Sequence, residues 1–278
     1  MSTVTISAQE INKLRQTTGA GMLDCRKALT ETNGDFEAAI DWLRKQGQKV
    51  AAKRSDREAK EGVVIAQTTS NKKTGIVVCV SCETDFVSKN SDFVAFAQII
   101  ADAAIKNDIK NLDDLMNTKA GDSTVSELVN DKLASIGEKI GVTKFARIDA
   151  DYVASYIHGA YRIGVLVGMN KENAEAGKDV AMQIAALNPV AVDGASVPAE
   201  VIAREKDIIM ELMKQDPKMA GKSDEMLAKI AEGKMGAFFK EQTLTAQAFV
   251  KDAGKTIADY LKECGDLKVT EFKRVALG

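Results

Sequence analysis

The chain has 278 residues, which is long enough to bury a sizeable core and predicts about two domains. Its 38 lysines and arginines are balanced by 40 acidic residues, so the sequence offers no global basic field for nucleic acid or an anionic membrane. No apolar run approaches the roughly 20 residues that cross a bilayer. The four cysteines are too scattered for a disulfide framework, and residues 1–10 lack the pattern of a signal or transit peptide. We expect a cytoplasmic protein that binds neither nucleic acid nor membrane.

A three-helix module is predicted at the N-terminus. Ser7 and Glu10 have the capping-box spacing, in which each side chain binds the backbone amide of the other residue, so a helix is expected to begin there. A second helix is expected to start with Met22–Leu29 and to end by Asn33-Gly34, and a third opens at Asp35. Gly47 is expected to end the third helix, because glycine readily adopts the left-handed conformation that follows many helices.

The middle of the chain contains an apparent internal repeat. Residues 75–101 and 162–187 each read as an apolar strand, a polar turn and an alanine-rich helix. Another β-prone stretch precedes each segment, at residues 63–69 and 152–160. The pattern therefore predicts two related subdomains, each a hairpin followed by a helix. Further helices are expected over residues 112–116, 125–136, 198–216 and 223–233.

The last two of these helices predict a helical hairpin that is rich in methionine. Half of the ten methionines lie between residues 210 and 235, and flexible thioethers suit adaptable contact surfaces. A hairpin inserted in the second subdomain would serve as a protruding arm for another protein. The alternative is a hairpin that packs only on itself.

These elements predict an α+β fold. It comprises an N-terminal three-helix domain, a core of two related α+β subdomains with small antiparallel sheets, and a helical hairpin inserted in the second subdomain. The expected divisions are a three-helix domain at 1–48, a charged linker at 49–62, core subdomains at 63–148 and at 149–195 with 240–278, and an arm at 196–239.

Asp85 and Phe86 are the candidate functional pair. They follow a strongly β-prone segment that begins at Gly75, and a polar stretch follows them, so they are expected at a turn where a strand ends. A carboxylate beside an aromatic ring at such a position fits a probe that enters a partner protein. The structural alternative is that Phe86 turns inward to cap the core and Asp85 caps a helix.

Other motifs give no ordinary active site. Cys79 and Cys82 form a CxxC pair within a predicted strand, where residues three apart point to opposite faces, so neither a disulfide nor a shared metal is expected. The single histidine, His158, lies at the predicted turn of the second hairpin, and both a structural and a contact role are open. The sequence has no phosphate loop, nucleophile elbow or dinucleotide-binding motif. We predict a protein that is not an enzyme and uses no cofactor or metal.

Three motifs resemble the bacterial elongation factor Ts family. They are residues 18–29 (TGAGMLDCRKAL), residues 82–87 (CETDFV), and His158-Gly159 followed by residues 163–167 (IGVLV). Their order and spacing also match, and the similarity extends over essentially the whole chain. The resemblance implies a guanine-nucleotide exchange factor for elongation factor Tu, with a ubiquitin-associated-like N-terminal domain. It further implies GDP release by disturbance of the magnesium and phosphate site, and leaves homodimerisation through the arm open.

The resemblance also implies a set of partner-binding residues, carried over by position. They fall on Arg15, Met22, Leu23 and Arg26 in the N-terminal domain, on Thr84, Asp85, Phe86 and Val87 in the intruding element, and on Ile136, Gly137, His158 and Val250 in the core.

Three other functions compete with this interpretation. The first is an interaction module whose three-helix domain binds ubiquitin-like or other proteins while the core is only a scaffold. The second is a thiol enzyme that uses Cys79 and Cys82. The third is binding to tRNA or the ribosome, which the balanced charge and the lack of an aromatic and basic stripe disfavour.

Overall fold

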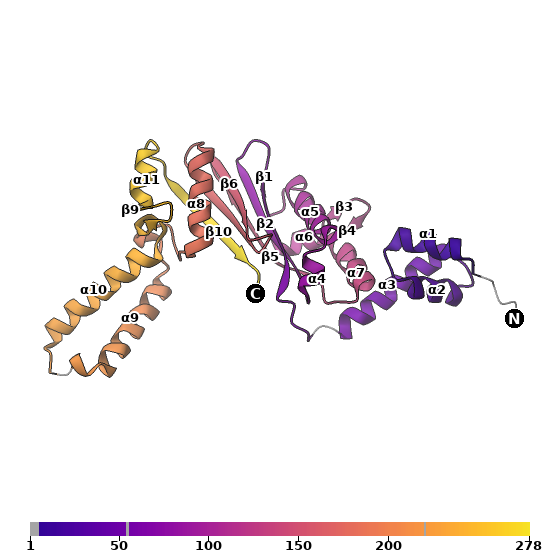
Figure 1. Ribbon diagram of the computed structural model, residues 1–278, viewed down its shortest axis with the longest axis horizontal. Helices are drawn as coiled ribbons and strands as arrows, with labels where there is room; N and C mark the ends of the chain where they lie inside the picture. Colours follow the sequence, from indigo (N-terminus) through magenta and orange to yellow (C-terminus); the bar gives the residue numbers. More distant parts are fainter. Residues whose placement is uncertain (1–5, 54–55, 220) are drawn as a thin grey trace.

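The structure is a computed structural model that describes residues 6–53, 56–219 and 221–278. Figure 1 shows an elongated molecule, with a helical head at one end, a sheet-based core in the middle and a two-helix arm at the other end. This combination confirms the predicted α+β class. Within the described residues, no helix combines the length and apolar character needed to cross a membrane.

The head consists of three helices, as predicted. Ser7 and Glu10 form the expected capping box at the start of the first helix, and Gly19 ends that helix in the left-handed conformation, with φ of 70°. The head has its own small core, in which Leu14, Cys25 and other apolar side chains are buried. The helices are α1 (Ala8–Thr18), α2 (Met22–Glu31) and α3 (Phe36–Lys53).

The prediction that Gly47 ends the third helix was wrong, because α3 continues to Lys53. Gly47 lies instead where α3 packs on α7 (Val125–Ile136) of the core. A Cβ atom at Gly47 would lie 2.7 Å from the Cβ of Ala134, which is closer than such atoms approach in real structures. The glycine therefore serves a close contact between two helices. The charge-rich stretch, which we expect from the sequence to be an exposed helical linker, is helical up to residue 53.

The first core sheet has the order β1-β2-β5 and is antiparallel. β2 is buried along nearly its whole length, which explains its continuous run of β-branched residues. Helix α5 packs on β1 and β2 and buries Phe93, Phe96 and Ile100 in the main core of this subdomain. Its elements are β1 (Glu61–Thr68), β2 (Thr74–Cys82), α4 (Asp85–Ser88), α5 (Ser91–Lys106), α6 (Leu112–Asn117), β3 (Lys119–Ala120), β4 (Ser123–Thr124), α7 and β5 (Gly141–Asp149).

The second core sheet repeats this plan with the order β10-β7-β6, which confirms the two related subdomains. In each sheet the second strand of a hairpin is central, and a strand from later in the chain pairs with its free side. Helix α8 covers β6 and β7 as α5 covers the first hairpin. The elements are β6 (Tyr152–His158), β7 (Ile163–Met169), α8 (Ala174–Leu187), β8 (Ala248–Phe249), β9 (Asp252–Thr256), α11 (Ile257–Glu263) and β10 (Val269–Ala276).

The two sheets face each other across a shared apolar layer that includes Val64, Val77, Val153 and Leu166. The approach is close: a Cβ atom at Gly164 would lie 2.7 Å from Val64 Cγ1. The two hairpins are therefore held in a fixed mutual position, and the segments that follow their strands are fixed with them.

The arm is a helical hairpin of α9 (Ala199–Gln215) and α10 (Asp224–Gln242), which projects from the second subdomain in Figure 1. The prediction that its second helix ends near residue 233 was wrong, since α10 continues to Gln242. Ile209, Met213 and Met235 are buried in a small core of its own, whereas Met210 and Met226 are exposed. The hairpin thus packs on itself and still presents thioethers to solvent.

Candidate functional site

The candidate pair lies on a one-turn helix, α4, that directly follows β2 and Glu83-Thr84. The side chain of Phe86 is 85% exposed, so the alternative in which it caps the core is wrong. Val87, the next residue, packs against the core of the first subdomain instead. We call residues 84–87 the tip: its aromatic ring points to solvent while its valine anchors it.

Asp85 does not cap the short helix, because Thr84 occupies the N-cap position. The Asp85 carboxylate accepts a hydrogen bond of 2.6 Å from Lys89 Nζ. This hydrogen bond and the lysine charge lower the pKa of the carboxyl group below its ordinary value. Asp85 is therefore an ionised group beside Phe86, and its ion-pair partner is an exposed lysine.

The base of the tip is fixed to the segment that follows α7. The Glu138 carboxylate accepts hydrogen bonds from the backbone N–H of Thr84 (3.0 Å) and from its hydroxyl group (2.7 Å). Two of the predicted site residues, Ile136 and Gly137, directly precede Glu138, and Gly137 ends α7 with φ of 78°. The structure therefore brings Ile136 and Gly137 to the tip, although they are more than 45 residues away in sequence.

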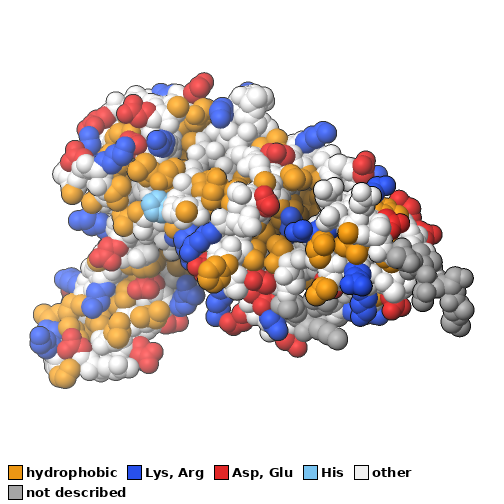
Figure 2. All heavy atoms as spheres, turned by 45° about the vertical axis from the view of Figure 1, so that its right-hand side comes forward, with side chains coloured by type: hydrophobic (Ala, Val, Ile, Leu, Met, Phe, Trp, Pro, Cys, Tyr) orange, Lys and Arg blue, Asp and Glu red, His pale blue; other side chains and the backbone are white. Residues whose placement is uncertain are grey.

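His158 lies at the end of β6, at the edge of the core that also carries the tip. It is exposed, and its Nδ1 is 3.0 Å from the hydroxyl oxygen of Tyr156; Figure 2 shows this single histidine in pale blue at the surface. Within the same β6–β7 hairpin, Arg162 forms a 3.1 Å ion pair with Glu61, and Glu61 pairs in register with Cys82 just before the tip. The hairpin of His158 is thereby tied to the strands that carry the tip.

The predicted residues of the head form a separate surface. Leu23 is 81% exposed and Met22 is 44% exposed in the first turn of α2, and Arg15 and Arg26 are exposed as well. An apolar residue as exposed as Leu23 has no role in the core of the head. Figure 1 places α1 and α2 at the far end of the molecule from the arm and α4 in the core, so the predicted residues of the head and those of the tip lie on different parts of the molecule.

Val250 lies on a third surface, in the turn between β8 and β9. Its side chain is 48% exposed, while Phe249 beside it is buried and stacks on Tyr260 with 4.5 Å between ring centroids. The backbone N–H of Val250 donates to Gln183 Oε1 at 2.9 Å. The turn is thus rigidly mounted on α8.

The cysteines do not form a reactive site. Cys79 and Cys82 belong to different core clusters on opposite faces of β2, as the spacing predicts, and both are free and buried. Burial, with the nearby charges of Glu138 and Glu61, raises the pKa of Cys82 to about 12. A thiol with this pKa holds its proton at neutral pH and is a poor nucleophile. The thiol-enzyme alternative is therefore disfavoured by the structure.

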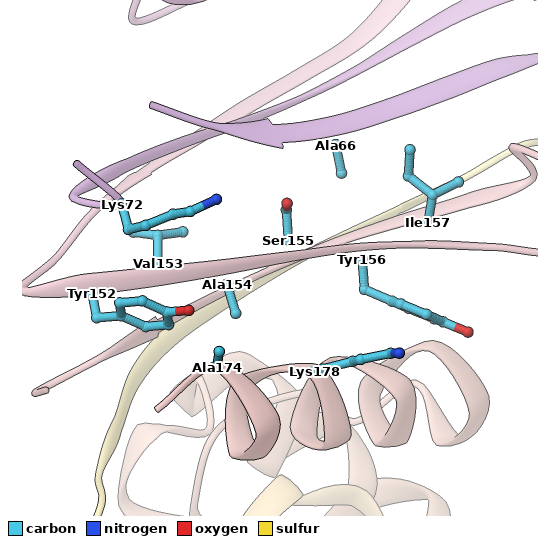
Figure 3. A pocket seen from close by; sticks show the side chains of 10 residues that line it. All are labelled: Ala66, Lys72, Tyr152, Val153, Ala154, Ser155, Tyr156, Ile157, Ala174 and Lys178. Carbon is cyan, nitrogen blue, oxygen red and sulfur yellow. The ribbon is translucent and has the colours of Figure 1, made fainter. Parts of the chain in front are cut away.

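The hollow along β6 does not resemble a catalytic centre. Figure 3 shows one of about 400 Å³ along β6, in which Tyr152, Ala154 and Tyr156 point towards α8 while Ser155 points towards β1. Lys72 and Lys178 are the charged residues that line it, and it contains no nucleophile with an adjacent base. Among the described residues, no cluster of three or more His, Cys, Asp or Glu side chains fits a metal ion.

Sequence reasoning missed the residues that support the tip. Glu83, Glu138 and Lys139 were not predicted to have any role, nor was Arg57, which forms a 2.9 Å ion pair with Glu83. The sequence contains one relevant signal, since Glu138 and Lys139 directly follow the glycine that ends α7. That signal does not reveal which distant segment the two side chains reach.

Comparison with known proteins gives consistent matches over the whole chain. The family model described as Elongation factor TS matches residues 83–278, which include the tip. Elongation factor Ts of Christiangramia forsetii is 44% identical over 277 residues, which cover 98% of this chain and 99% of that protein. Elongation factor Ts of Flavobacterium psychrophilum is 41% identical over 278 residues, covering 99% of each. The protein of the same name from Amoebophilus asiaticus is 44% identical over 278 residues, covering 98% of this chain and 99% of its own length.

Proposed function

Since the chain belongs to the elongation factor Ts family of translation elongation factors, we propose that it binds elongation factor Tu in the cytoplasm and accelerates the release of GDP from it. The observation that supports this function most directly is the exposure of Phe86. An aromatic side chain that is 85% exposed on an anchored turn gains little from its position in the free protein. It gains much if a partner buries it.

The proposed mechanism requires no covalent chemistry. GTP-binding proteins hold GDP through phosphate-loop amides and through a magnesium ion that bridges protein and phosphate oxygens. Phe86 would enter the partner near the magnesium site, and Asp85 would present a negative charge beside it. The partner would then be stabilised in a conformation that holds the ion and the phosphates poorly.

Thermodynamic linkage sets the balance of this exchange. If contact with the tip weakens the partner's affinity for GDP by some factor, bound GDP weakens the partner's affinity for the tip by the same factor. Each tenfold change corresponds to about 1.4 kcal/mol. Nucleotide binding therefore displaces the exchange factor by the same coupling that released GDP. A central interface aromatic is typically worth on the order of 2–4 kcal/mol, or roughly 30-fold to several hundred-fold, so other contacts must share the work.

The head, the residues after α7, and the turns of His158 and Val250 supply candidates for those contacts. Under this proposal, Leu23, Met22, Arg15 and Arg26 dock the head on the partner. Ile136, Gly137 and His158 would make contacts around the tip, while Val250 would touch a different part of the partner. Each of these side chains or turns is at least partly accessible at the surface of the molecule.

The test is the substitution Phe86→Ala. We expect catalysed release of a fluorescent GDP from elongation factor Tu, measured by stopped flow, to slow at least tenfold. The reason is that the variant lacks the ring that enters the partner, which we call the wedge. The melting curve should not change, since the ring makes little contact with its own protein. Leu187→Ala, which truncates a 45% exposed leucine at the end of α8, is the matched control and should exchange like the parent protein. An unchanged rate for Phe86→Ala would refute the wedge.

A further inference from the structure

Two carboxylates connect the tip to the loop after α7 in a reciprocal arrangement, which we call the clasp. Glu138 accepts hydrogen bonds from the N–H and the hydroxyl group of Thr84, at 3.0 and 2.7 Å. Glu83, the residue before Thr84, accepts a hydrogen bond of 2.6 Å from the backbone N–H of Lys139, the residue after Glu138. Each of the two segments therefore contributes one carboxylate and one backbone amide.

The clasp also includes the segment that joins the head to the core. Arg57 Nη1 donates to the second oxygen of Glu83 at 2.9 Å, and Lys139 Nζ donates to the backbone carbonyl of Arg57 at 2.8 Å. The Glu83 side chain is only 14% exposed in this ion pair. Three parts of the chain that are distant in sequence thus meet beneath the tip.

Thr84 has a special place in this arrangement. It is the N-cap residue of α4, where a threonine hydroxyl ordinarily accepts a hydrogen bond from the backbone of the first turn, yet its side chain makes no capping bond. The hydroxyl donates to Glu138 instead. A helix of four residues has little stability of its own. Glu138 therefore supports the orientation of α4, and with it the direction of Phe86, from outside the helix, in addition to the packing of Val87 on the core.

We propose that Glu138 is a positioning residue for nucleotide exchange, which holds the tip in the orientation in which Phe86 enters the partner; this inference rests on the proposed function. A carboxylate suits this position, because Thr84 presents a backbone N–H and a hydroxyl group and a carboxylate offers one acceptor oxygen to each. A glutamine can accept from the N–H and donate to the hydroxyl oxygen, but it lacks the negative charge that strengthens both hydrogen bonds. An alanine removes both hydrogen bonds to Thr84 and leaves the Val87 anchor and the Glu83 half of the clasp in place.

Loss of this support affects the reaction rather than the fold. An unsupported tip samples several orientations, and only a fraction of them present Phe86 correctly, so the coupling to the partner falls while the rest of the docking surface is intact. We expect Glu138→Ala to lower the maximal rate of catalysed GDP release about tenfold, as for a tip that adopts the productive orientation about a tenth of the time. Glu138→Gln should give an intermediate loss. The factor concentration that gives half-maximal exchange should change less than threefold.

The decisive experiment is a double-mutant cycle with Phe86→Ala, followed by stopped-flow GDP release and melting curves for all variants. If Glu138 acts through Phe86, Glu138→Ala has almost no further effect in the Phe86→Ala background. Equal losses in both backgrounds, or a parent-like rate for Glu138→Ala alone, would overturn the inference. If Phe86→Ala itself exchanges normally, the wedge proposal fails, and this result is distinct from the other two.

Two further variants keep the test independent of folding. Thr84→Val removes the hydroxyl group that donates the hydrogen bond to Glu138. The fall in exchange rate that this variant causes should therefore not add to the fall caused by Glu138→Ala. Glu263→Ala removes an exposed carboxylate that accepts a 2.6 Å hydrogen bond from Lys255 on α11, and it serves as the matched control. If Glu138→Ala melts at a much lower temperature, the Thr84→Val variant decides, because a parent-like rate for it also overturns the inference.

Discussion

Phe86 and Val87 are neighbours in opposite environments, and helical geometry is the reason. Successive residues of a helix are separated by about 100° around its axis, so one turn presents one of the two to the core and the other to solvent. Val87 packs on the core, and Phe86 is consequently turned outward. The exposure of the ring is therefore fixed by the anchor beside it.

The thiols give a prediction at the same scale. Cys25, Cys79 and Cys82 are buried, and burial raises the pKa of Cys25 and Cys82, whereas Cys264 is partly exposed. We expect a thiol reagent at pH 8 to label one of the four cysteines rapidly in the native protein and all four after denaturation, because only accessible thiolates react. Peptide mapping should identify Cys264. Rapid labelling of Cys82 would show that the strand before the tip opens, and would contradict the rigid base described above.

At the scale of elements, the contact between α3 and α7 determines how the head is attached to the core. Gly47 faces Ala134 with no room for a methyl group, and Arg44 lies 3.8 Å from Asp131 nearby. This ion pair is at the surface and contributes little to stability, so close packing of the two helices is the main interaction between them. Because α7 ends at the clasp, the same helix connects the head to the tip.

Gly47→Ala tests this contact. The substitution favours the helix itself but overpacks the contact with α7, so the sign of the change in stability shows which effect is larger. Alanine is favoured over glycine in a helix by about 1 kcal/mol, whereas overpacking costs about 1–3 kcal/mol. We expect the overpacking to prevail and the thermal midpoint measured by circular dichroism to fall. Gly236→Ala in α10, where a Cβ atom meets nothing within 4 Å, is the control and should be neutral or stabilising. Adding Ala134→Gly to Gly47→Ala should recover part of the loss; a stabilised Gly47→Ala protein would refute the contact.

The elements differ in how well the sequence predicts them. Local signals placed the capping box at Ser7, α7 over residues 125–136 and the two hairpins, because capping and periodicity depend on nearby residues. The strands β5 and β10 were missed, because their apolar residues do not alternate regularly with polar ones and because their partners, β2 and β7, are distant in sequence. Gly47 was misread for the same reason. Its role depends on Ala134, which is distant in sequence.

The site shows the same limit. Asp85 and Phe86 were noticed because an acid and an aromatic follow an apolar strand, and the family resemblance supplied the other candidates. Neither source indicated Glu138, whose proposed role depends on a hydrogen bond to Thr84 across the subdomain. Supporting residues of this kind are recognised by geometry, because their chemistry at the sequence level is that of any surface carboxylate.

At the scale of the whole molecule, the head and the tip are separate surfaces joined through α3, α7 and the clasp. Attachment of one surface to a partner raises the effective concentration of the other, so weak individual contacts combine into strong binding. Under the proposed function, the head would contribute affinity for the partner, while the tip would couple binding to the release of the nucleotide. The exposed arm is distant from both surfaces in Figure 1.

This division predicts different kinetic effects for the two surfaces. Leu23→Ala removes an 81% exposed side chain of the head, so the factor concentration for half-maximal GDP release should rise about five- to tenfold, as for an interface residue worth on the order of 1 kcal/mol. The maximal rate should stay within twofold, because the tip is intact. Leu212→Ala, which truncates a 55% exposed leucine of the arm, is the control. A lower maximal rate with unchanged half-saturation would mean that the head acts on the nucleotide site itself, and the division between docking and coupling would then be wrong.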